Sequence, residues 1–298
     1  MWIPDFVCPA CQAALAERAQ AYTCQRCGAS FRIDGFVYRF MLPEQTDSAQ
    51  AFLTQYRSVR RADGHSEVAR ASYATLPAVP RGSPNAAEWR IRRQSFDTAV
   101  SCGGLRTNPR RRVLDVGAGN GWLSSRLSEL GHDVVAVDLD DDAGDGLGAA
   151  KSRKPFPLVQ AHFDAMPFAP GQFDLVMMNA SLHYSPDPGR TSEAAARLLC
   201  PGGTLIVMDS PMFEDPADGE AMVARQLEAL RSSYSMKQPI RPGVGFLTFA
   251  GLQEIASRIG RGARFFPSHG PLVWRARRAW SARRLGRAPA AFGVWVTR

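Results

Sequence analysis

Apolar positions follow two alternating patterns through the last two-thirds of this chain. Short continuous apolar runs, such as Val134–Val137, alternate with stretches in which apolar residues recur every three or four positions. After residue 121, Leu123, Leu127 and Leu130 have that helical spacing. Short apolar runs between helices are typical of parallel strands buried on both faces. The pattern therefore predicts an α/β fold with a parallel sheet covered by helices on both sides.

The strand at residues 113–116 runs into a glycine-rich turn. Gly117, Gly119 and Gly121 stand at alternate positions, and a helix pattern follows at once. Such a turn lets a ligand approach the backbone, and the free N–H groups of the helix start point at that ligand. The dinucleotide fingerprint G-x-G-x-x-G fails here, because Trp122 occupies its third glycine position. The pattern that fits is D-x-G-x-G-x-G.

Four further segments follow this turn in order. A second strand ends at Asp138, 23 residues after Asp115, where an acid can accept hydrogen bonds from ribose hydroxyls. The other three segments are residues 158–168, 173–179 and 198–207.

Together these five segments resemble the motifs of the class I S-adenosylmethionine (SAM)-dependent methyltransferases, with a methyltransferase-11-like domain. Cys200 stands where that family usually has lysine. The resemblance implies a Rossmann-like seven-stranded methyltransferase domain over residues 106–298, with its last strands at 263–267 and 291–297. It implies an enzyme that uses SAM. The residues that the resemblance assigns to SAM are Asp115, Gly117, Ala118, Gly119, Gly121, Asp138, Leu139, Asp164, Ala165 and Asn179.

The segment after the fourth strand carries a candidate base. Residues 180–188 resemble the "LHH-x-x-DP" segment found near small-molecule methyl acceptors, with Tyr184 replacing the second histidine. His183 should lie at the carboxyl end of a parallel strand, beside the ligand crevice, which makes it the candidate catalytic residue. A purely structural histidine packed against Pro186 is the competing interpretation.

Four cysteines precede this domain in the pattern C-x2-C-x12-C-x2-C: Cys8, Cys11, Cys24 and Cys27. Four thiolates at this spacing suit tetrahedral Zn²⁺ and leave no open position for water, so the metal is expected to be structural. Two disulfides or free thiols are the alternatives, and the sequence begins without a secretory signal pattern. Residues 1–42 resemble the zinc ribbons that precede some bacterial methyltransferases. So small a unit needs metal binding to fold.

Residues 43–105 form a third unit, a helical linker or lid. Two helix-prone stretches, about 48–74 and 86–100, flank a loop rich in proline. In the resembled family, segments before the first strand often close over the cofactor and substrate. Arg57, Arg60 and Arg92 are therefore candidates to meet a carboxylate, and solvated linker helices are the alternative.

Charge is unevenly distributed along the chain. Residues 57–112 carry 12 arginines and 4 acids, and residues 261–298 carry 9 arginines and no acid, whereas residues 113–260 have a net charge of −8. Basic flanks around an acidic cofactor domain favour an anionic substrate or surface. Of the 36 basic residues 33 are arginine, so genome composition is a competing explanation. No run of 18 apolar residues occurs, and we expect a cytoplasmic protein without a transmembrane segment.

These observations leave three functions open. The first is O- or C-methylation of a small-molecule or lipid-type acceptor, which the segment around His183 favours. The second is methylation of ribosomal or transfer RNA. The chain resembles ribosomal RNA guanine methyltransferases with an N-terminal zinc ribbon, although their second knuckle ends in histidine where this chain has Cys27. The third is a SAM-binding module without activity. The oligomeric state stays open.

The segment 272–288 combines six arginines with Trp274 and Trp280. Helical spacing places Val273, Trp280 and Arg284 on one face, so it does not separate apolar from charged residues. A free membrane-surface helix is therefore disfavoured, and an RNA grip by arginine and tryptophan is a second interpretation. We expect both tryptophans to pack on the domain and several arginines to face an acidic acceptor.

Overall fold

The computed structural model describes residues 1–65, 73–106, 109–150 and 156–298. Within these residues an eleven-stranded sheet has the strand order β1-β2-β3-β4-β7-β6-β5-β8-β9-β13-β12. Seven of its strands make the predicted Rossmann-like sheet: β5 (Arg112–Val116), β6 (Asp133–Asp138), β7 (Leu158–Gln160), β8 (Phe173–Asn179), β9 (Leu199–Met208), β12 (Ala263–Pro267) and β13 (Gly293–Thr297). Strands β5 to β9 are parallel, and β13 is antiparallel to both of its neighbours. The predicted fold class is confirmed.

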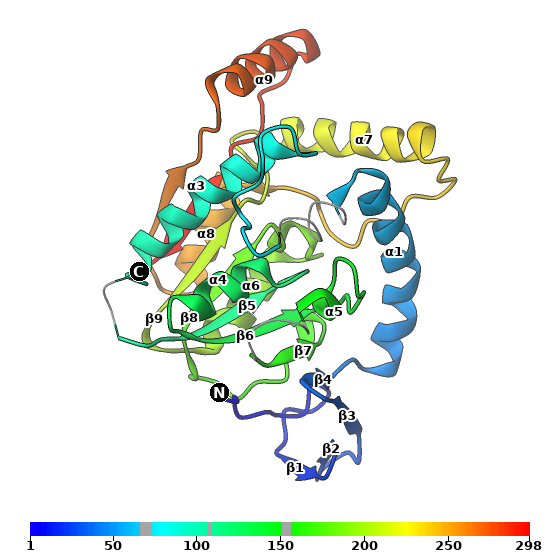
Figure 1. The fold of residues 1–298 in the computed structure, drawn as a ribbon, viewed down its shortest axis with the longest axis vertical. Coiled ribbons are helices and arrows are strands. Elements are labelled where there is room, and N and C mark those ends of the chain that lie inside the picture. The colour runs from blue at the N-terminus through cyan, green and yellow to red at the C-terminus, as the bar shows by residue number, and fades with distance from the viewer. Residues whose placement is uncertain (66–72, 107–108, 151–155) are drawn as a thin grey trace.

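Helices cover both faces of this sheet (Figure 1). One face packs on α3 (Ala86–Cys102), α4 (Trp122–Glu129) and α5 (Leu147–Ala150), the other on α6 (Pro188–Arg197) and α8 (Phe249–Arg258). Along β6, Val134 and Ala136 join the first core, whereas Val135 and Val137 join the second. This is why β6 has a continuous apolar sequence rather than an alternating one.

Helix ends follow the local sequence. At the start of α8 the Thr248 hydroxyl accepts a hydrogen bond from the Gly251 N–H at 3.0 Å, and Gly260 beyond the helix has φ +65°. Helix α6 begins at Pro188, because Asp187 caps it and Pro188 fits its first turn.

The N-terminal cysteine segment extends the sheet. Strands β1 (Leu15–Arg18), β2 (Ala21–Cys24), β3 (Ser30–Asp34) and β4 (Val37–Arg39) form an antiparallel ribbon, with the expected turn at Gly35. Strand β4 then pairs in parallel with β7, so that Tyr38 faces Val159 across the pair. Phe40 and Phe168, from the ribbon side and the domain side, share one core. The ribbon therefore covers an edge of the sheet that would otherwise be open.

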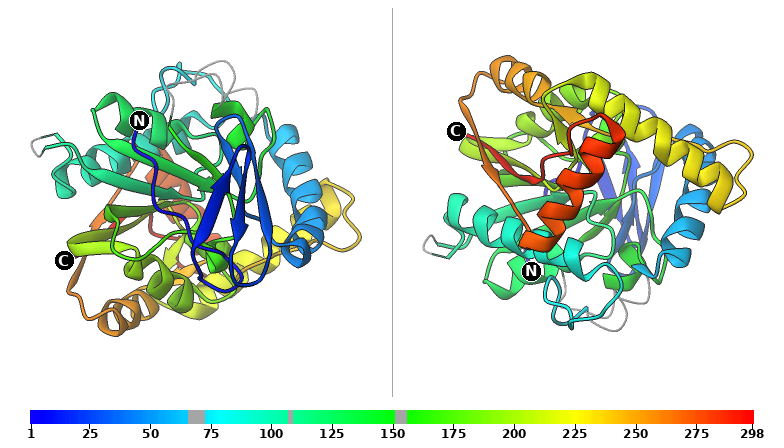
Figure 2. Two further views of the ribbon diagram at one scale, coloured as in Figure 1. Left: turned by 90° about the horizontal axis from the view of Figure 1, so that it is seen from below. Right: turned by 90° about the horizontal axis from the view of Figure 1, so that it is seen from above.

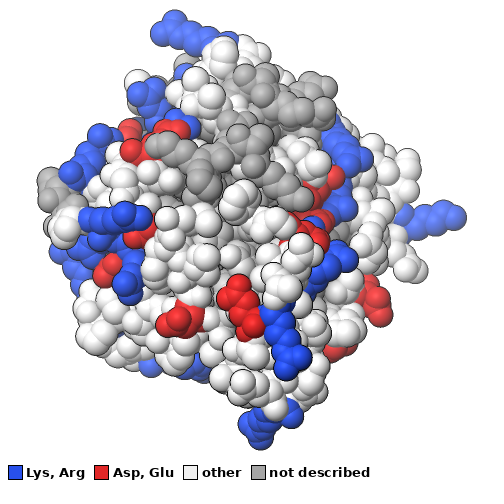
Figure 3. All heavy atoms as spheres, turned by 60° about the horizontal axis from the view of Figure 1, so that its bottom comes forward, with Lys and Arg blue, Asp and Glu red and all other residues white. Residues whose placement is uncertain are grey.

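Outer segments surround the carboxyl ends of the parallel strands. They are α1 (Pro43–Ala62), η1 (Phe163–Ala165), η2 (Leu182–Tyr184), β10 (Met212–Phe213), α7 (Pro216–Ser233), β11 (Leu247–Thr248) and α9 (Leu272–Leu285). Of the helix-prone stretch 48–74, the part at 66–72 lies outside the described residues. Figures 1 and 2 show the ribbon and α9 at opposite ends of the molecule. At the ribbon end, basic and acidic side chains are interspersed (Figure 3).

Helix α9 packs differently from our expectation. Trp274 is half-buried, as predicted, but Trp280 is 64% exposed, so the prediction for Trp280 is wrong. Trp274, Arg278 and Ala282 are the half-buried positions at a spacing of four residues. Trp280 lies about 120° around the helix axis from Trp274, which turns it away from the domain. Among the helices described, none is both long and apolar enough to span a bilayer.

Candidate functional site

The glycine turn after β5 takes a backbone path that only glycine follows easily. Gly117, Gly119 and Gly121 have φ values of +75°, +53° and +72°. A Cβ on Gly117 would come within 2.2 Å of the Ser181 side chain, whereas one on Gly119 would meet nothing closer than the Asp145 carbonyl oxygen at 3.8 Å. Gly117 therefore serves packing, and Gly119 leaves space open for a ligand.

Asp138 lies opposite this turn at the end of β6. Its Oδ2 accepts the Gly119 N–H and its Oδ1 accepts the Asp140 N–H, both at 2.7 Å. Each oxygen retains a lone pair for a further donor. Burial raises the pKa of Asp138 to about 6. The carboxylate is thus fixed in orientation and can still receive hydroxyl groups.

A cavity of about 820 Å³ opens in front of the turn and of Asp138. Six of the predicted cofactor residues line it: Gly117, Ala118, Gly119, Asp138, Leu139 and Asn179. Asp115, Gly121, Asp164 and Ala165 do not line it. Two lining residues that sequence reasoning missed, Asn120 and Phe163, are direct neighbours of predicted ones.

Asp115 lies behind the turn and is fully buried. Its Oδ2 accepts a hydrogen bond from the Ser124 hydroxyl at 2.7 Å, and burial raises its pKa to about 7. This contact joins β5 to α4 directly below the glycines. In this structure Asp115 therefore supports the turn from behind. Asp164 also has a protein partner, because its Oδ1 accepts the Thr191 hydroxyl at 2.8 Å.

Two observations indicate that SAM fits the part of the cavity beside the glycine turn. The space over Gly119 is open, and the Asp138 carboxylate is held by backbone N–H groups with lone pairs to spare. Bound there, SAM supplies a methyl group activated by a sulfonium charge.

The same cavity also has aromatic walls. Phe52 and Tyr56 come from α1, Tyr184 from η2 and Trp89 from α3. The rings of Tyr56 and Tyr184 meet edge to face at 6.0 Å between centroids. Large rings from three separate elements make a chamber that suits an apolar or aromatic ligand body.

His183 lies at this chamber, on the 3-10 turn after β8. Its Nδ1 is 3.0 Å from the Ser210 hydroxyl. Burial lowers the pKa of the imidazole to about 3, so the ring is neutral at ordinary pH. A neutral ring held by one nitrogen has the orientation that a general base requires, and it also satisfies a structural histidine.

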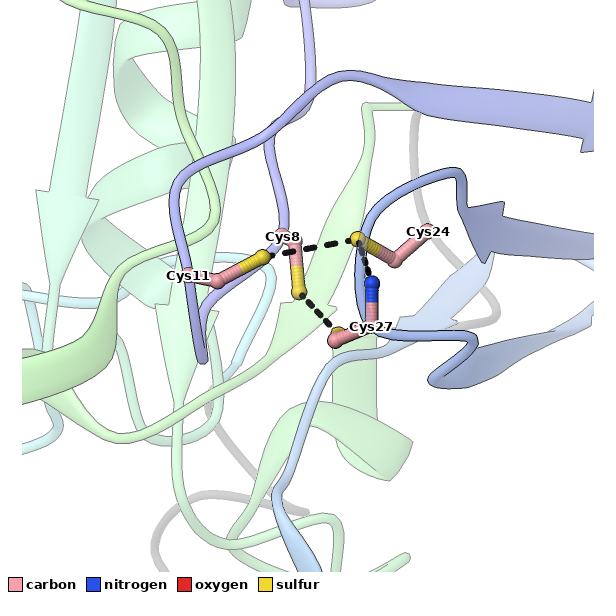
Figure 4. A group of neighbouring side chains, drawn as sticks. All are labelled: Cys8, Cys11, Cys24 and Cys27. Atoms are coloured by element: carbon pink, nitrogen blue, oxygen red, sulfur yellow. Dashed lines mark hydrogen bonds between the residues drawn. The ribbon is translucent and has the colours of Figure 1, made fainter.

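The four N-terminal cysteines form one cluster (Figure 4). Their sulfur atoms all lie within 4.8 Å of one another. Cys8 and Cys27 are separated by 3.7 Å between sulfurs, and Cys11 and Cys24 by 3.5 Å. These separations are far longer than the roughly 2.05 Å of a disulfide. They are close to the edge of about 3.8 Å of a tetrahedron with Zn–S bonds of about 2.3 Å.

Backbone amides face the cluster as well. The N–H groups of Cys27 and Arg26 both donate to the Cys24 sulfur at 3.4 Å and lower the pKa of that thiol to about 6. The geometry and the donor set fit Zn²⁺.

Residues 114–207 match the methyltransferase domain family. They are a class I methyltransferase domain. The resemblance inferred from the five segments is thereby confirmed, together with the four-cysteine cluster in front of the domain. Within this domain, the five motif segments correspond in chain order to β5, β6, β7, β8 and β9.

Known relatives match part of the chain. A ubiquinone biosynthesis O-methyltransferase of Xanthomonas campestris pv. campestris is 38% identical over 146 residues, which cover 45% of this chain and 58% of the relative. An uncharacterized methyltransferase of Mycobacterium tuberculosis is 42% identical over 95 residues, 32% of this chain and 38% of the relative. The chain thus spans little more than half the length of the curated relatives that it matches.

A solved structure shares the fold. Magnesium protoporphyrin IX methyltransferase of Synechocystis, with S-adenosylhomocysteine bound, has a TM-score of 0.53 and 16% identity, covering 82% of this chain and 99% of that one. At this identity the likeness shows the fold alone.

Asp209 is a site residue that sequence reasoning missed. It follows β9, lines the cavity and is only 6% exposed. Its Oδ1 accepts the Ser95 hydroxyl at 2.5 Å, and that hydroxyl lies 2.8 Å from the Ser268 hydroxyl. Its Oδ2 has no partner among the described residues. The sequence signal was an acid directly after a parallel strand, as at Asp138.

The environment of Asp209 is costly for a carboxylate. Its backbone has φ +56°, a left-handed conformation that residues other than glycine rarely adopt. Burial raises its pKa to about 6, against a lowering effect from Arg92. Strain and desolvation together at one cavity residue are typical of functional positions.

The arginines of the helical linker divide into two groups. Arg57 pairs with Asp140, and Arg60 pairs with Asp145, so both bind the loop after β6 rather than face an open carboxylate site. Arg92 lies over the Trp89 ring at 4.6 Å, lines the cavity and makes no ion pair with a described residue. Of the three candidates, Arg92 is the one available to a ligand anion.

Arg278 of α9 is a second cation without a carboxylate partner among the described residues. Its guanidinium lies over the rings of Trp274 and Phe292 and donates to the Ala290 carbonyl at 2.6 Å. Burial lowers its pKa to about 10, so it stays charged at neutral pH. Arg278 lines the same cavity as Arg92.

Proposed function

We propose that this protein transfers the methyl group of SAM to an oxygen or carbon of a small-molecule or lipid-type acceptor that carries an anionic group. The observation that carries this proposal is a single cavity whose lining combines two kinds of chemistry. The glycine turn and Asp138 line it together with aromatic rings and the arginines Arg92 and Arg278. A cation near aromatic rings binds an anionic group on an apolar body.

The relatives support a small acceptor. The Xanthomonas relative is named for O-methylation in ubiquinone biosynthesis, and a hydroxylated aromatic acid suits the aromatic walls and the free arginines. The expected SAM residues stay a proposal: Gly117, Ala118, Gly119, Asp138, Leu139 and Asn179 contact the cofactor directly, and Asp115, Gly121, Asp164 and Ala165 support it.

Proton removal from the acceptor is the step that the protein's own side chains perform. We propose that Asp209 Oδ2 accepts the acceptor proton, because that oxygen is buried and unpartnered and its residue lines the cavity. Methyl transfer then breaks the sulfur–methyl bond, leaves its electron pair on sulfur and forms the bond to the acceptor atom. The proton leaves Asp209 for solvent after product release. His183 is the second candidate for this role.

The cysteine cluster is proposed to hold one structural Zn²⁺. The four cysteine sulfurs would occupy all four coordination positions of the zinc ion, which leaves none for water or substrate. Its contribution is the folding of residues 1–42 and, through β4, the covering of the sheet edge.

The test is an acceptor screen with methyl-labelled SAM and the full chain. Hydroxybenzoic acids, prenylated phenols and total bacterial RNA form three pools. We expect label in the first or second pool, and loss of transfer in an Arg92→Gln, Arg278→Gln variant that still binds SAM in calorimetry. Label only in RNA would replace the proposed acceptor class. SAM binding with no methyl transfer to any pool would contradict the proposed enzymatic activity.

A further inference from the structure

Helix α9 packs on the domain through one side only. It connects β12 to β13, and none of the α9 residues whose burial is described is fully buried. Trp274 and Arg278 hold its inner side, and the Ala288 N–H beyond its end donates to Asp218 Oδ1 at 3.0 Å. Figure 1 shows the helix projecting at the end of the molecule opposite the ribbon. Most of its surface is therefore free.

The outer side of α9 carries large exposed apolar side chains. Leu272, Val273 and Trp280 are 77%, 67% and 64% exposed, and Ala276 and Ala279 are exposed beside them. On a helix, Leu272, Trp280 and Val273 lie within an arc of about 100°. We call these five residues the outer face. Three large apolar side chains so exposed on one helix mark an interaction surface.

Arginines lie both within and beside this outer face: Arg283 falls inside its arc, and Arg284 lies about 20° around the axis from Val273. Arg275, Arg277, Arg283 and Arg284 are exposed and make no ion pair with any described residue. The guanidinium of Arg284 lies 5.7 Å from the Trp280 ring. Residues 261–298 contain no acidic residue at all. The surface therefore offers apolar insertion and positive charge together.

We propose that the outer face of α9 docks on an anionic lipid bilayer. Leucine, valine and tryptophan enter the boundary between headgroups and acyl chains, and the arginines contact anionic headgroups. Arginines are interspersed with the apolar residues, so α9 would dock at headgroup depth, where the long arginine side chains reach the headgroups while the apolar side chains enter the boundary.

Other occupants fit the surface less well. RNA would use the arginines and stack on Trp280, but it gives Leu272 and Val273 no partner. A second copy of the chain would bring two arginine-rich, acid-free helices together, which repel each other. Lipid is the partner that uses both the aliphatic and the basic residues.

The position of α9 links the bilayer to the site. Trp274, Arg278, Ser281 and Ala282 line the cavity from the inner side of the same helix. This part of the inference rests on the proposed function: a lipid-type acceptor would pass from the bilayer to the cavity along α9. Docking itself is independent of any methyl transfer.

The test is flotation of the full chain with vesicles of phosphatidylcholine alone or mixed with phosphatidylglycerol. Two variants remove the two components: Leu272→Ser with Val273→Ser and Trp280→Ser, and Gln at Arg275, Arg277, Arg283 and Arg284. Matched controls are Phe36→Ser and Gln at Arg18, Arg81, Arg225 and Arg231, which are exposed elsewhere. SAM calorimetry on every variant verifies folding and reports on the methyltransferase site separately.

We expect the wild type and both controls to float with the mixed vesicles and to shift tryptophan emission to the blue. Each α9 variant should bind at least about tenfold more weakly, because one loses the apolar side chains that insert and the other loses the charges that attract anionic headgroups. No flotation of the wild type, or an equal loss in the controls, would overturn the proposal. So would vesicle-independent dimers that the serine variant dissolves, or RNA binding that both α9 variants abolish while flotation is unchanged.

Discussion

The Arg39 guanidinium donates a hydrogen bond to the Gln160 side-chain oxygen at 2.7 Å, and so joins the cysteine ribbon to the cofactor domain. The same Arg39 nitrogen donates to Asp141 Oδ2 at 2.5 Å. Gln160 in turn donates to the Leu139 carbonyl at 3.2 Å. Leu139 lines the cavity. A ribbon residue therefore positions the loop that follows Asp138.

Replacing Arg39 by Gln should weaken SAM binding without contact to SAM. Losing hydrogen bonds that hold the 139–141 loop costs about 1 kcal/mol, or roughly fivefold in Kd. Calorimetry with SAM measures it. Arg32→Gln is the control, because Arg32 pairs only with Asp34 on the exposed ribbon surface. Equal affinity of wild type and Arg39→Gln would show that the ribbon does not position this loop.

Gly119→Val and Asp138→Ala should each reduce SAM affinity at least about tenfold, or about 1.4 kcal/mol. The valine places atoms in the space open over Gly119, and the alanine removes the ribose acceptor. Both proteins should remain folded. Gly117→Ala should instead lower Tm, because its Cβ meets Ser181 at 2.2 Å. Wild-type affinity in both of the first two variants would reject the cofactor site.

Metal analysis of the purified chain should find close to one zinc per molecule. Cys24→Ser should lower the zinc content and increase amide hydrogen exchange over residues 1–42, because metal binding supplies the folding energy of that segment. Cys102→Ser, outside the cluster, is the control. A disulfide among the four cysteines in mass spectrometry would contradict the zinc site.

Asp209→Asn should remove the pH dependence that the Asp209 carboxyl gives to turnover and to the free energy of unfolding. The folded-state pKa is raised from 3.8 to about 6, so wild-type stability falls as pH rises from about 4 through about 6. The variant should therefore be more stable above pH 6, on the order of 2–3 kcal/mol, and similar below pH 4. Denaturant titrations at both pH values measure this.

Turnover of the same pair gives the second readout. With an acceptor from the screen, the wild-type rate should rise through pH 6 as Asp209 ionises, and Asp209→Asn should lose most of it with SAM affinity retained. Arg92 is the charged group that acts on Asp209, so Arg92→Gln should move the midpoint upward. An unchanged rate in Asp209→Asn would assign proton removal elsewhere.

His183→Ala should cut turnover and leave SAM affinity intact. The imidazole is neutral because burial lowers its pKa to about 3, and Ser210 orients it. Ser210→Ala is the companion variant and should show a smaller loss of the same kind. If the His183→Ala rate matches the wild type while its Tm falls, His183 has a structural role.

Local sequence determined those features of this protein that are built from residues close together in the chain. The glycine turn, the acid that ends β6 and the two cysteine knuckles each lie within a few residues, so spacing alone predicts their geometry. The seven-stranded sheet follows from the order of buried strands. The ends of α8 are equally local, because Thr248 and Gly260 lie directly beside the helix in the chain.

Tertiary structure alone decided which distant residues meet. Nothing local to Arg39 specifies Gln160, 121 positions away, and the pairing of β4 with β7 depends on an open sheet edge that exists only in the folded domain. Ser95 and Asp209, 114 positions apart, make a candidate base only when α3 packs beside β9. Likewise the helical pattern of α9 was readable, but which side is buried depends on the surface it meets. Periodicity specifies the faces of a helix, and packing chooses between them.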